Sequence, residues 1–111
     1  MVEYFKIIYS DVVEEFLESL DGKVRKKIIY NLDKARWNLD PELFKKLDKG
    51  IWEFRTKYNK KQYRLLAFWD TRKATETLVI ATHGFIKKTK RTPKSEIDKA
   101  RKIMKVYFKI T

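Results

Sequence analysis

The chain has 111 residues, of which 43% are hydrophobic and 14% aromatic, so it is long enough for one domain with a core and too apolar to be disordered. The absence of cysteine excludes disulfides and thiolate metal sites and fits the cytoplasm, where we expect the protein, and we expect neither a signal peptide nor a membrane span. The formal net charge is +12, distributed as −5 over residues 1–22, +9 over 23–85 and +8 over 86–111, which favours a polyanionic partner such as nucleic acid.

The N-terminal third of the chain predicts a strand followed by two helices. Residues 3–9 are rich in β-branched and aromatic side chains, which favours the strand. Ser10 or Asp11 can cap the first helix, and Asp21-Gly22 ends it. The apolar stripe of the first helix is Val13, Phe16, Leu17 and Leu20, and that of the second is Val24, Ile28, Leu32, Ala35 and Leu39.

The middle of the chain predicts a short third helix and a β-hairpin. Pro41 follows Asp40 and suits the first turn of a helix over residues 41–47. The stretch "IWEFRTKYNKKQYRLLAFW", residues 51–69, is typical of a hairpin whose turn is the four residues "NKKQ". One face of this hairpin is apolar and should pack under the two N-terminal helices.

The last part of the chain predicts one more strand and a C-terminal helix. Residues 75–85 form the expected strand, and a basic loop, "IKKTKRT", follows it. Thr92-Pro93 starts the helix, whose apolar face is Ile97, Ala100, Met104, Tyr107 and Phe108. We therefore expect a single α+β domain over residues 1–111, in which an N-terminal strand and a helical hairpin pack on a mainly antiparallel four-stranded sheet with a C-terminal helix.

Three cations, Arg55, Lys57 and Arg64, are predicted to share the second face of the hairpin. With the four-residue turn, Lys57 lies opposite Arg64 and Arg55 lies diagonal to it, and we expect Arg64 to be exposed. Like charges that oppose each other across strands are destabilising, and a bound anion would relieve the repulsion. We interpret the cluster as a phosphodiester-binding face. The alternative is an ordinary solvated strand face on which Glu53 and Asp70 screen the cations.

The residue types on this face favour metal-free cleavage of RNA over metal-dependent chemistry. Nucleases that use Mg²⁺ gather several carboxylates, whereas this face offers Glu53, and a single histidine without cysteine is a poor zinc site. RNA carries its own nucleophile in the 2′-OH, so cleavage needs a base, an acid and cations that stabilise the transition state. Arg55 and Arg64 suit that stabilisation. The candidates for proton transfer are His83, Glu53 and a lysine whose pKa is lowered by neighbouring cations. Lys87 and Lys88 follow the last strand and could close the cationic site from its other side.

Three of these candidates also have simpler interpretations. A lone histidine at a strand end, such as His83, more often has a structural role, and Lys87 and Lys88 could belong to a solvated loop. Basic and aromatic side chains of the hairpin turn and of the loop complete the candidate RNA-binding surface. They are Lys57, Tyr58, Lys60, Lys61, Lys90 and Arg91.

Three segments of the sequence carry a family resemblance. They are "GIWEFR" at 50–55, "YRLL" at 63–66 and "HGFIKKT" at 83–89, the last followed by a proline and a basic helix. Together they resemble the RelE/ParE superfamily of bacterial type II toxins, and most closely its phage-derived HigB-like subgroup. The resemblance implies a ribosome-dependent mRNA endoribonuclease that needs neither metal nor cofactor.

The resemblance also implies roles for individual residues. Arg64 matches the arginine of the family's Tyr-Arg segment, and Arg55 and Lys57 match its strand cations. Lys87 or Lys88 matches the base that follows the last strand. These residues coincide with the cluster that strand alternation brings together.

Two positions depart from the family pattern. Glu53 stands where some members carry a lysine, so it either acts as the base or orients Arg55. No tyrosine occurs near Ile97, where some members stack a nucleobase. Stacking would then fall to another aromatic side chain, Tyr58 or Phe85.

The partners and the alternatives follow from the same resemblance. We expect a cognate helix-turn-helix antitoxin, mRNA on the ribosome, and operator DNA bound through the toxin–antitoxin complex. One alternative is a ParE-like inhibitor of DNA gyrase, which would share the fold without the catalytic cations. Another is a basic nucleic-acid-binding module that has lost its activity.

Overall fold

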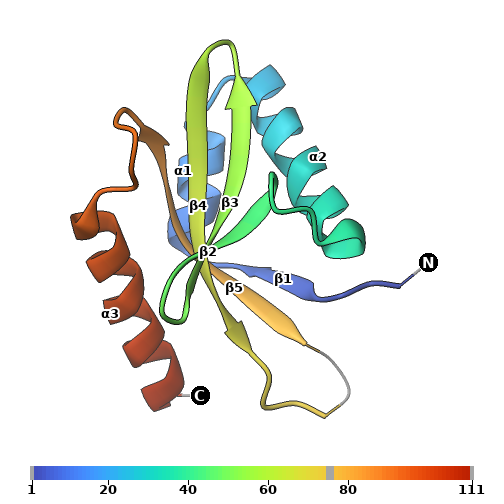
Figure 1. Ribbon diagram of the computed structural model, residues 1–111, viewed down its shortest axis with the longest axis vertical. Helices are drawn as coiled ribbons and strands as arrows, with labels where there is room; N and C mark the ends of the chain where they lie inside the picture. The colour runs from blue at the N-terminus through green and yellow to red at the C-terminus, as the bar shows by residue number, and fades with distance from the viewer. Residues whose placement is uncertain (1, 75–76, 111) are drawn as a thin grey trace.

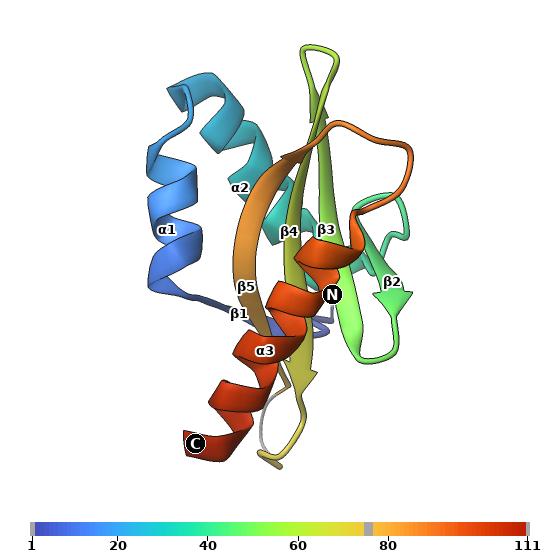
Figure 2. The same cartoon turned by 90° about the vertical axis from the view of Figure 1, so that its left-hand side faces the viewer.

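In the computed structural model, which describes residues 2–74 and 77–110, a sheet lies between two N-terminal helices on one face and the C-terminal helix on the other (Figure 1, Figure 2). Its five strands lie in the order β1-β5-β4-β3-β2, with β1 and β5 parallel and the other neighbours antiparallel. This confirms the α+β class and adds one strand to the four expected. The elements are β1 (Lys6–Tyr9), α1 (Asp11–Glu18), α2 (Gly22–Asn38), β2 (Phe44–Asp48), β3 (Ile51–Tyr58), β4 (Lys61–Asp70), β5 (Leu78–Lys87) and α3 (Lys94–Ile110). None of the helices described is long and apolar enough to cross a membrane.

Side-chain caps set where the two N-terminal helices begin. Ser10, rather than Asp11, caps α1, because its Oγ accepts a hydrogen bond from the Val13 N–H at 3.1 Å. The same hydroxyl donates to the Thr82 carbonyl at 3.0 Å, which ties the start of α1 to β5. Asp21 caps α2 with its carboxylate, whereas the sequence suggested that it ends the first helix.

Both faces of the sheet carry an apolar core. The predicted stripes of α1 and α2 pack together on one face, as expected, and the predicted stripe of α3 packs on the other face. The buried residues on the α1–α2 side include Val13, Leu17, Val24, Ile28, Leu32, Ala35, Phe54, Tyr63 and Leu65, and those on the α3 side include Ile51, Leu66, Phe68 and Ala100. Leu39 is an exception, because it ends α2 in the left-handed region, with φ of 37°, and is exposed.

The predicted third helix is wrong, because residues 44–48 form strand β2. The helical geometry after Asp40 lasts a single turn, in which the Leu43 and Phe44 N–H groups both donate to the Asp40 carbonyl at 2.9 Å. The Phe44 ring then stacks on the Phe54 ring of β3 with centroids 4.2 Å apart. Gly50, with φ of 75°, provides the turn into β3. Long-range aromatic packing therefore overrides the local helical signal.

The hairpin of β3 and β4 forms in a different register from the one predicted. Its turn contains two residues, Asn59 and Lys60, whose φ values of 51° and 66° are those of a type I′ turn. Arg55 consequently lies directly opposite Arg64, and Lys57 lies opposite Gln62. Each residue of β3 pairs with the β4 residue two positions before the one predicted. Because side chains alternate with a period of two, every side chain keeps its predicted face.

Strand β5 matches the strand predicted over residues 75–85 and continues to Lys87. Thr75 and Glu76, where the prediction begins, lie outside the described residues. One extra residue in β5, Thr82, shifts its register with β4, and the strand beyond this bulge continues along the hairpin to its tip.

The C-terminal half of α3 is anchored to the far end of β4. The Tyr107 hydroxyl donates to Asp70 Oδ2 at 2.7 Å, and Arg72 Nε and Nη2 donate to the same carboxylate at 2.9 Å. These bonds hold the pKa of Asp70 well below its usual range. The Arg72 guanidinium also lies 4.8 Å from the centroid of the Phe108 ring. Anchored in this way, α3 covers one half of the sheet and leaves the hairpin tip uncovered (Figure 1).

The close packing of α1 on β5 is tested by Gly84→Ala. A methyl group at position 84 would lie 2.3 Å from the Phe16 ring and 2.6 Å from the Leu65 side chain, so we expect a loss of about 2 kcal/mol in the free energy of unfolding. Gly22→Ala is the matched control, because its methyl group meets its nearest neighbour at 3.7 Å and should change stability little. Urea denaturation of the two variants measures the difference. Equal midpoints would contradict the packing described.

Candidate anion-binding and catalytic site

Three rows of side chains cross the sheet on the α3 side, near the hairpin tip. Since alternate residues of paired strands share a face, the register fixes which side chains are neighbours. The rows are Lys57–Gln62–Lys87, Arg55–Arg64–Phe85 and Lys45–Glu53–Leu66–His83. We call the charged members near the tip, Lys45, Glu53, Arg55, Lys57, Arg64 and Lys87, the cationic cluster.

Arg64 is the buried centre of the cationic cluster, with 2% of its surface exposed, so the expectation that it is exposed is wrong. Its Nη1 donates to the Tyr63 carbonyl and its Nη2 donates to Gln62 Oε1, both at 3.1 Å. Its Nε lies 3.3 Å from Glu53 Oε1. Burial lowers the pKa of Arg64, Arg55 lowers it further, and the Glu53 carboxylate opposes both effects. Arg64 therefore acts on its neighbours as a fixed internal charge.

Glu53 is buried among groups that hold its carboxylate. Its Oε1 accepts a hydrogen bond from the Thr92 hydroxyl at 3.0 Å, and its Oε2 lies 4.0 Å from Arg55 Nε. This environment suits the orienting role left open by the sequence better than the role of a base that touches substrate. The bond to Thr92 also ties the loop before α3 to the sheet. Across the part of the chain that the structure describes, no three His, Asp or Glu side chains group as metal ligands would.

The Nε atoms of two guanidinium groups in the cationic cluster face the Glu53 carboxylate without forming a hydrogen bond to it. Arg55 Nε and Arg64 Nε are both buried, and neither forms a hydrogen bond to any of the described residues. Buried donors in folded proteins nearly always have a partner. The Arg55 side chain is 33% exposed, so an anion from solvent can reach it. This pair of directly opposed arginines therefore favours a bound oxyanion.

Lys87, at the end of β5, is the cluster's clearest candidate for proton transfer. Burial lowers its pKa, and the positive charges of Arg64, Arg55 and Lys45 lower it further, while Glu53 opposes them. Lys45 is absent from the site predicted from the sequence, because the sequence predicts a helix over residues 41–47. On β2 it pairs directly with Glu53.

The basic side chains of the tip and the loop line an open depression beside Lys87. Three of the predicted RNA-binding lysines lie there together with the catalytic candidate Lys88. The lining residues are Lys60, Lys61, Gln62, Ile86, Lys87, Lys88, Thr89 and Lys90. Lys57 and Arg91 are exposed outside this lining. The surface that surrounds the candidate site is therefore strongly cationic.

His83 lies inside the molecule rather than at the candidate site. It is 1% exposed, with Nε2 3.2 Å from Glu96 Oε1 and Nδ1 3.0 Å from Thr82 Oγ1. Burial lowers its pKa, and nearby Lys99 adds to that effect. His83 thus links β5 to the first turn of α3, which is the structural role that the sequence left open, and it has no access to a substrate.

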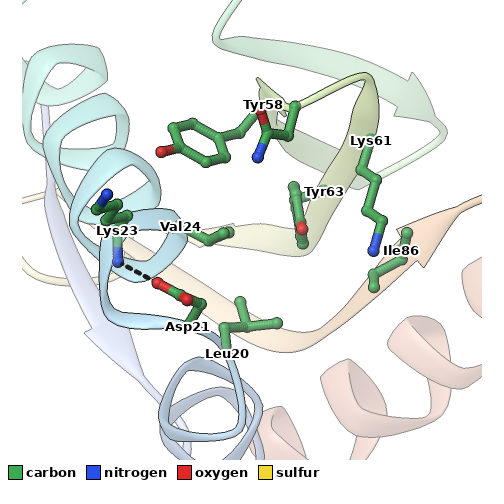
Figure 3. A pocket seen from close by; sticks show the side chains of 9 residues that line it. Leu20, Asp21, Lys23, Val24, Tyr58, Lys61, Tyr63 and Ile86 are labelled. Atoms are coloured by element: carbon green, nitrogen blue, oxygen red, sulfur yellow. Dashed lines mark hydrogen bonds between the residues drawn. The ribbon is translucent and has the colours of Figure 1, made fainter.

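The two predicted stacking residues lie on opposite faces of the sheet. Phe85 lies beside Arg64 on the cationic side, half-buried, with its ring 5.9 Å from that of His83. Tyr58 instead lies on the α1–α2 side, in a separate pocket with Tyr63 and Val24 (Figure 3). Stacking by Tyr58 next to the cationic cluster is therefore ruled out by the geometry.

Comparisons with known proteins agree with this fold. Residues 15–105 match the family described as "Phage derived protein Gp49-like (DUF891)". Among solved structures, the chain is similar to a mutant of the E. coli toxin RelE in the free state, with a TM-score of 0.58 and 14% identity over 91% of this chain and 97% of that one. The likeness extends to the fold and confirms the predicted RelE-like architecture. No curated protein matches.

The structural role of Arg64 is tested by Arg64→Ala. Because the change removes a buried charge that faces the Glu53 carboxylate, we expect the free energy of unfolding to fall by about 3 kcal/mol. Lys57→Ala, on the same face but exposed, should change it by less than about 0.5 kcal/mol. Urea denaturation followed by circular dichroism measures both. An Arg64→Ala protein as stable as Lys57→Ala would contradict the buried pairing.

Proposed function

The chain belongs to the phage-derived Gp49-like family, and on that premise we propose that it is the toxin of a type II toxin–antitoxin system, a ribosome-dependent endoribonuclease that cuts mRNA without a metal. The observation that carries the proposal is the cationic cluster. Two directly opposed arginines share the single carboxylate of Glu53 and stand beside a lysine of lowered pKa. A phosphodiester bound there would meet both a charge stabiliser and a proton-transfer group.

The proposed reaction is attack of the 2′-OH of RNA on the adjacent phosphorus. The O2′–P bond forms and the P–O5′ bond breaks, which leaves a 2′,3′-cyclic phosphate and a 5′-hydroxyl end. The neutral amine of Lys87 takes the 2′-OH proton, and the ammonium group of Lys45 on β2 supplies a proton to O5′. Each atom and proton of the cleavage is thereby accounted for by the substrate and two lysines.

The arginines have different parts in this proposal. Arg55, one third exposed, donates to the phosphate oxygens on which negative charge develops. Arg64 stays buried and acts as a positioning residue, because its charge holds Glu53 and lowers the pKa of Lys87. Glu53 and Thr92 keep the loop with Lys88 and Lys90 against the sheet.

The partners follow from charge and from the family. The +12 chain, with its basic depression, would be attracted to the RNA backbone of the ribosome and its mRNA. An acidic antitoxin with a helix-turn-helix domain would neutralise the toxin in the cytoplasm. The antitoxin would carry the complex to operator DNA and make most of the base contacts.

Induced expression of the chain without its antitoxin is expected to arrest growth and to leave mRNA cut within translated codons. Arg55→Ala should lower cleavage about 100-fold, because it removes a donor to the transition-state charge. Lys26→Ala, an exposed cation on α2 across the sheet, is the control and should cut like the wild type. Sequencing of transcript 5′ ends after induction measures the effect. Full cleavage by Arg55→Ala would contradict the site, and intact mRNA with DNA damage would favour a gyrase inhibitor.

The rate of cleavage on purified ribosomes is expected to rise with pH. Lys87 must be neutral to accept a proton, so the rate grows as pH rises through its pKa, which lies below that of an ordinary lysine. Lys87→Arg keeps the charge and should lose both the rate and this pH dependence, whereas Lys88→Arg should keep both. Single-turnover rates across a pH series measure this. The same pH profile in Lys87→Arg would exclude Lys87 as the base.

A further inference from the structure

A second pocket lies on the opposite face of the hairpin tip, where no part of the proposed cleavage takes place. It has a volume of about 840 Å³, within the range of small-ligand sites. Figure 3 shows its side chains arranged around a central space, with Tyr58 and Tyr63 from the hairpin facing the start of α2. The residues that line it include Leu20, Asp21, Val24, Tyr58, Tyr63 and Ile86, together with the polar residues Lys23, Asn59 and Lys61.

The pocket and the basic depression are neighbours across the end of the sheet. Lys61 and Ile86 line both of them. A single extended chain could therefore follow the lysines of the depression with its backbone and turn one group into the pocket. Successive phosphates and bases of single-stranded RNA have this arrangement, with charge on the backbone and flat aromatic groups beside it.

Among the described polar residues that line the pocket, Asp21 carries the one carboxylate, and this group distinguishes between possible occupants. One oxygen of Asp21, Oδ1, accepts the Lys23 N–H at 2.8 Å, and the other makes no hydrogen bond to the part of the chain that the structure describes. An apolar peptide side chain would cover this carboxylate without supplying a donor, which is unfavourable. A nucleobase brings its own N–H groups, and guanine presents two adjacent ones that match a carboxylate. The tyrosine rings supply surfaces on which a base can stack.

We propose that this pocket binds a nucleobase of single-stranded RNA, with a preference for guanine, while Lys61 holds the adjoining phosphate. Tyr58 stacks on the base, and Asp21 accepts its N–H groups. The inference rests on the proposed RNA substrate and extends it, because it places a base-reading subsite on the α1–α2 side of the hairpin. The hairpin tip would then contact RNA on both faces of the sheet.

The test is a heteronuclear NMR titration of the full chain with guanosine 5′-monophosphate, and with inorganic phosphate as the probe for the anion alone. The nucleotide is expected to shift the signals of Val24, Ile86 and the Tyr58 ring, which phosphate does not shift. Tyr58→Leu keeps an apolar side chain and should bind about tenfold more weakly, because it removes the stacking ring. Tyr30→Leu, at an exposed tyrosine on α2, is the control and should bind like the wild type.

Three results would overturn the proposal. They are shifts confined to the lysines of the depression, equal binding by Tyr58→Leu, and pocket shifts caused by an acidic peptide of leucine and glutamate but not by the nucleotide. Arg55→Ala separates this inference from the cleavage itself. That variant should still bind the nucleotide although it cuts RNA about 100-fold less, so a failed nuclease assay and a failed titration are distinct outcomes.

Discussion

The direct opposition of Arg55 and Arg64 across β3 and β4 is the constraint on which the rest of the candidate site depends. Like charges facing each other across strands cost stability, and burial of Arg64 increases the cost because water cannot screen it. Glu53, one row further along the sheet, provides one negative charge for the two arginines. Burial lowers the pKa of Lys87, and the excess positive charge lowers it further. We propose that a phosphodiester is the ligand that offsets this charge.

The fold exposes this charge while it protects the core. The bonds of Tyr107 and Arg72 to Asp70 hold α3 over one half of the sheet, and the type I′ turn carries the hairpin tip beyond it. The hydrogen bond from Thr92 to Glu53 closes the connection between β5 and α3 at the border of the cationic cluster. On the other face, the capped start of α2 meets Tyr58 and forms a pocket. One hairpin thus presents the cationic cluster on one side and, on the other, the aromatic surface that Figure 3 shows.

Local patterns in the sequence were sufficient for α1, α2, α3, the faces of the hairpin and the fold class, because strand and helix periods decide which side chains are buried. They failed where distant contacts decide. Strand β2 depends on stacking between Phe44 and Phe54. Because the sequence predicted a helix there, it did not place Lys45 beside Glu53. The hairpin register depended on positive φ at Lys60, which its side chain does not favour. Arg64 was expected at the surface because charged residues usually are, whereas Gln62 and Glu53 hold it inside.

The central claim is that the cluster is built to receive an anion beside Lys87. The most direct measurement is the titration of the Lys87 side-chain amine by NMR, with and without a 2′-deoxy dinucleotide that cannot be cut. In the free protein the amine should titrate below an ordinary lysine, and its pKa should rise when the phosphodiester binds and offsets the neighbouring cations. An amine with an ordinary pKa that does not change with the dinucleotide would contradict the account.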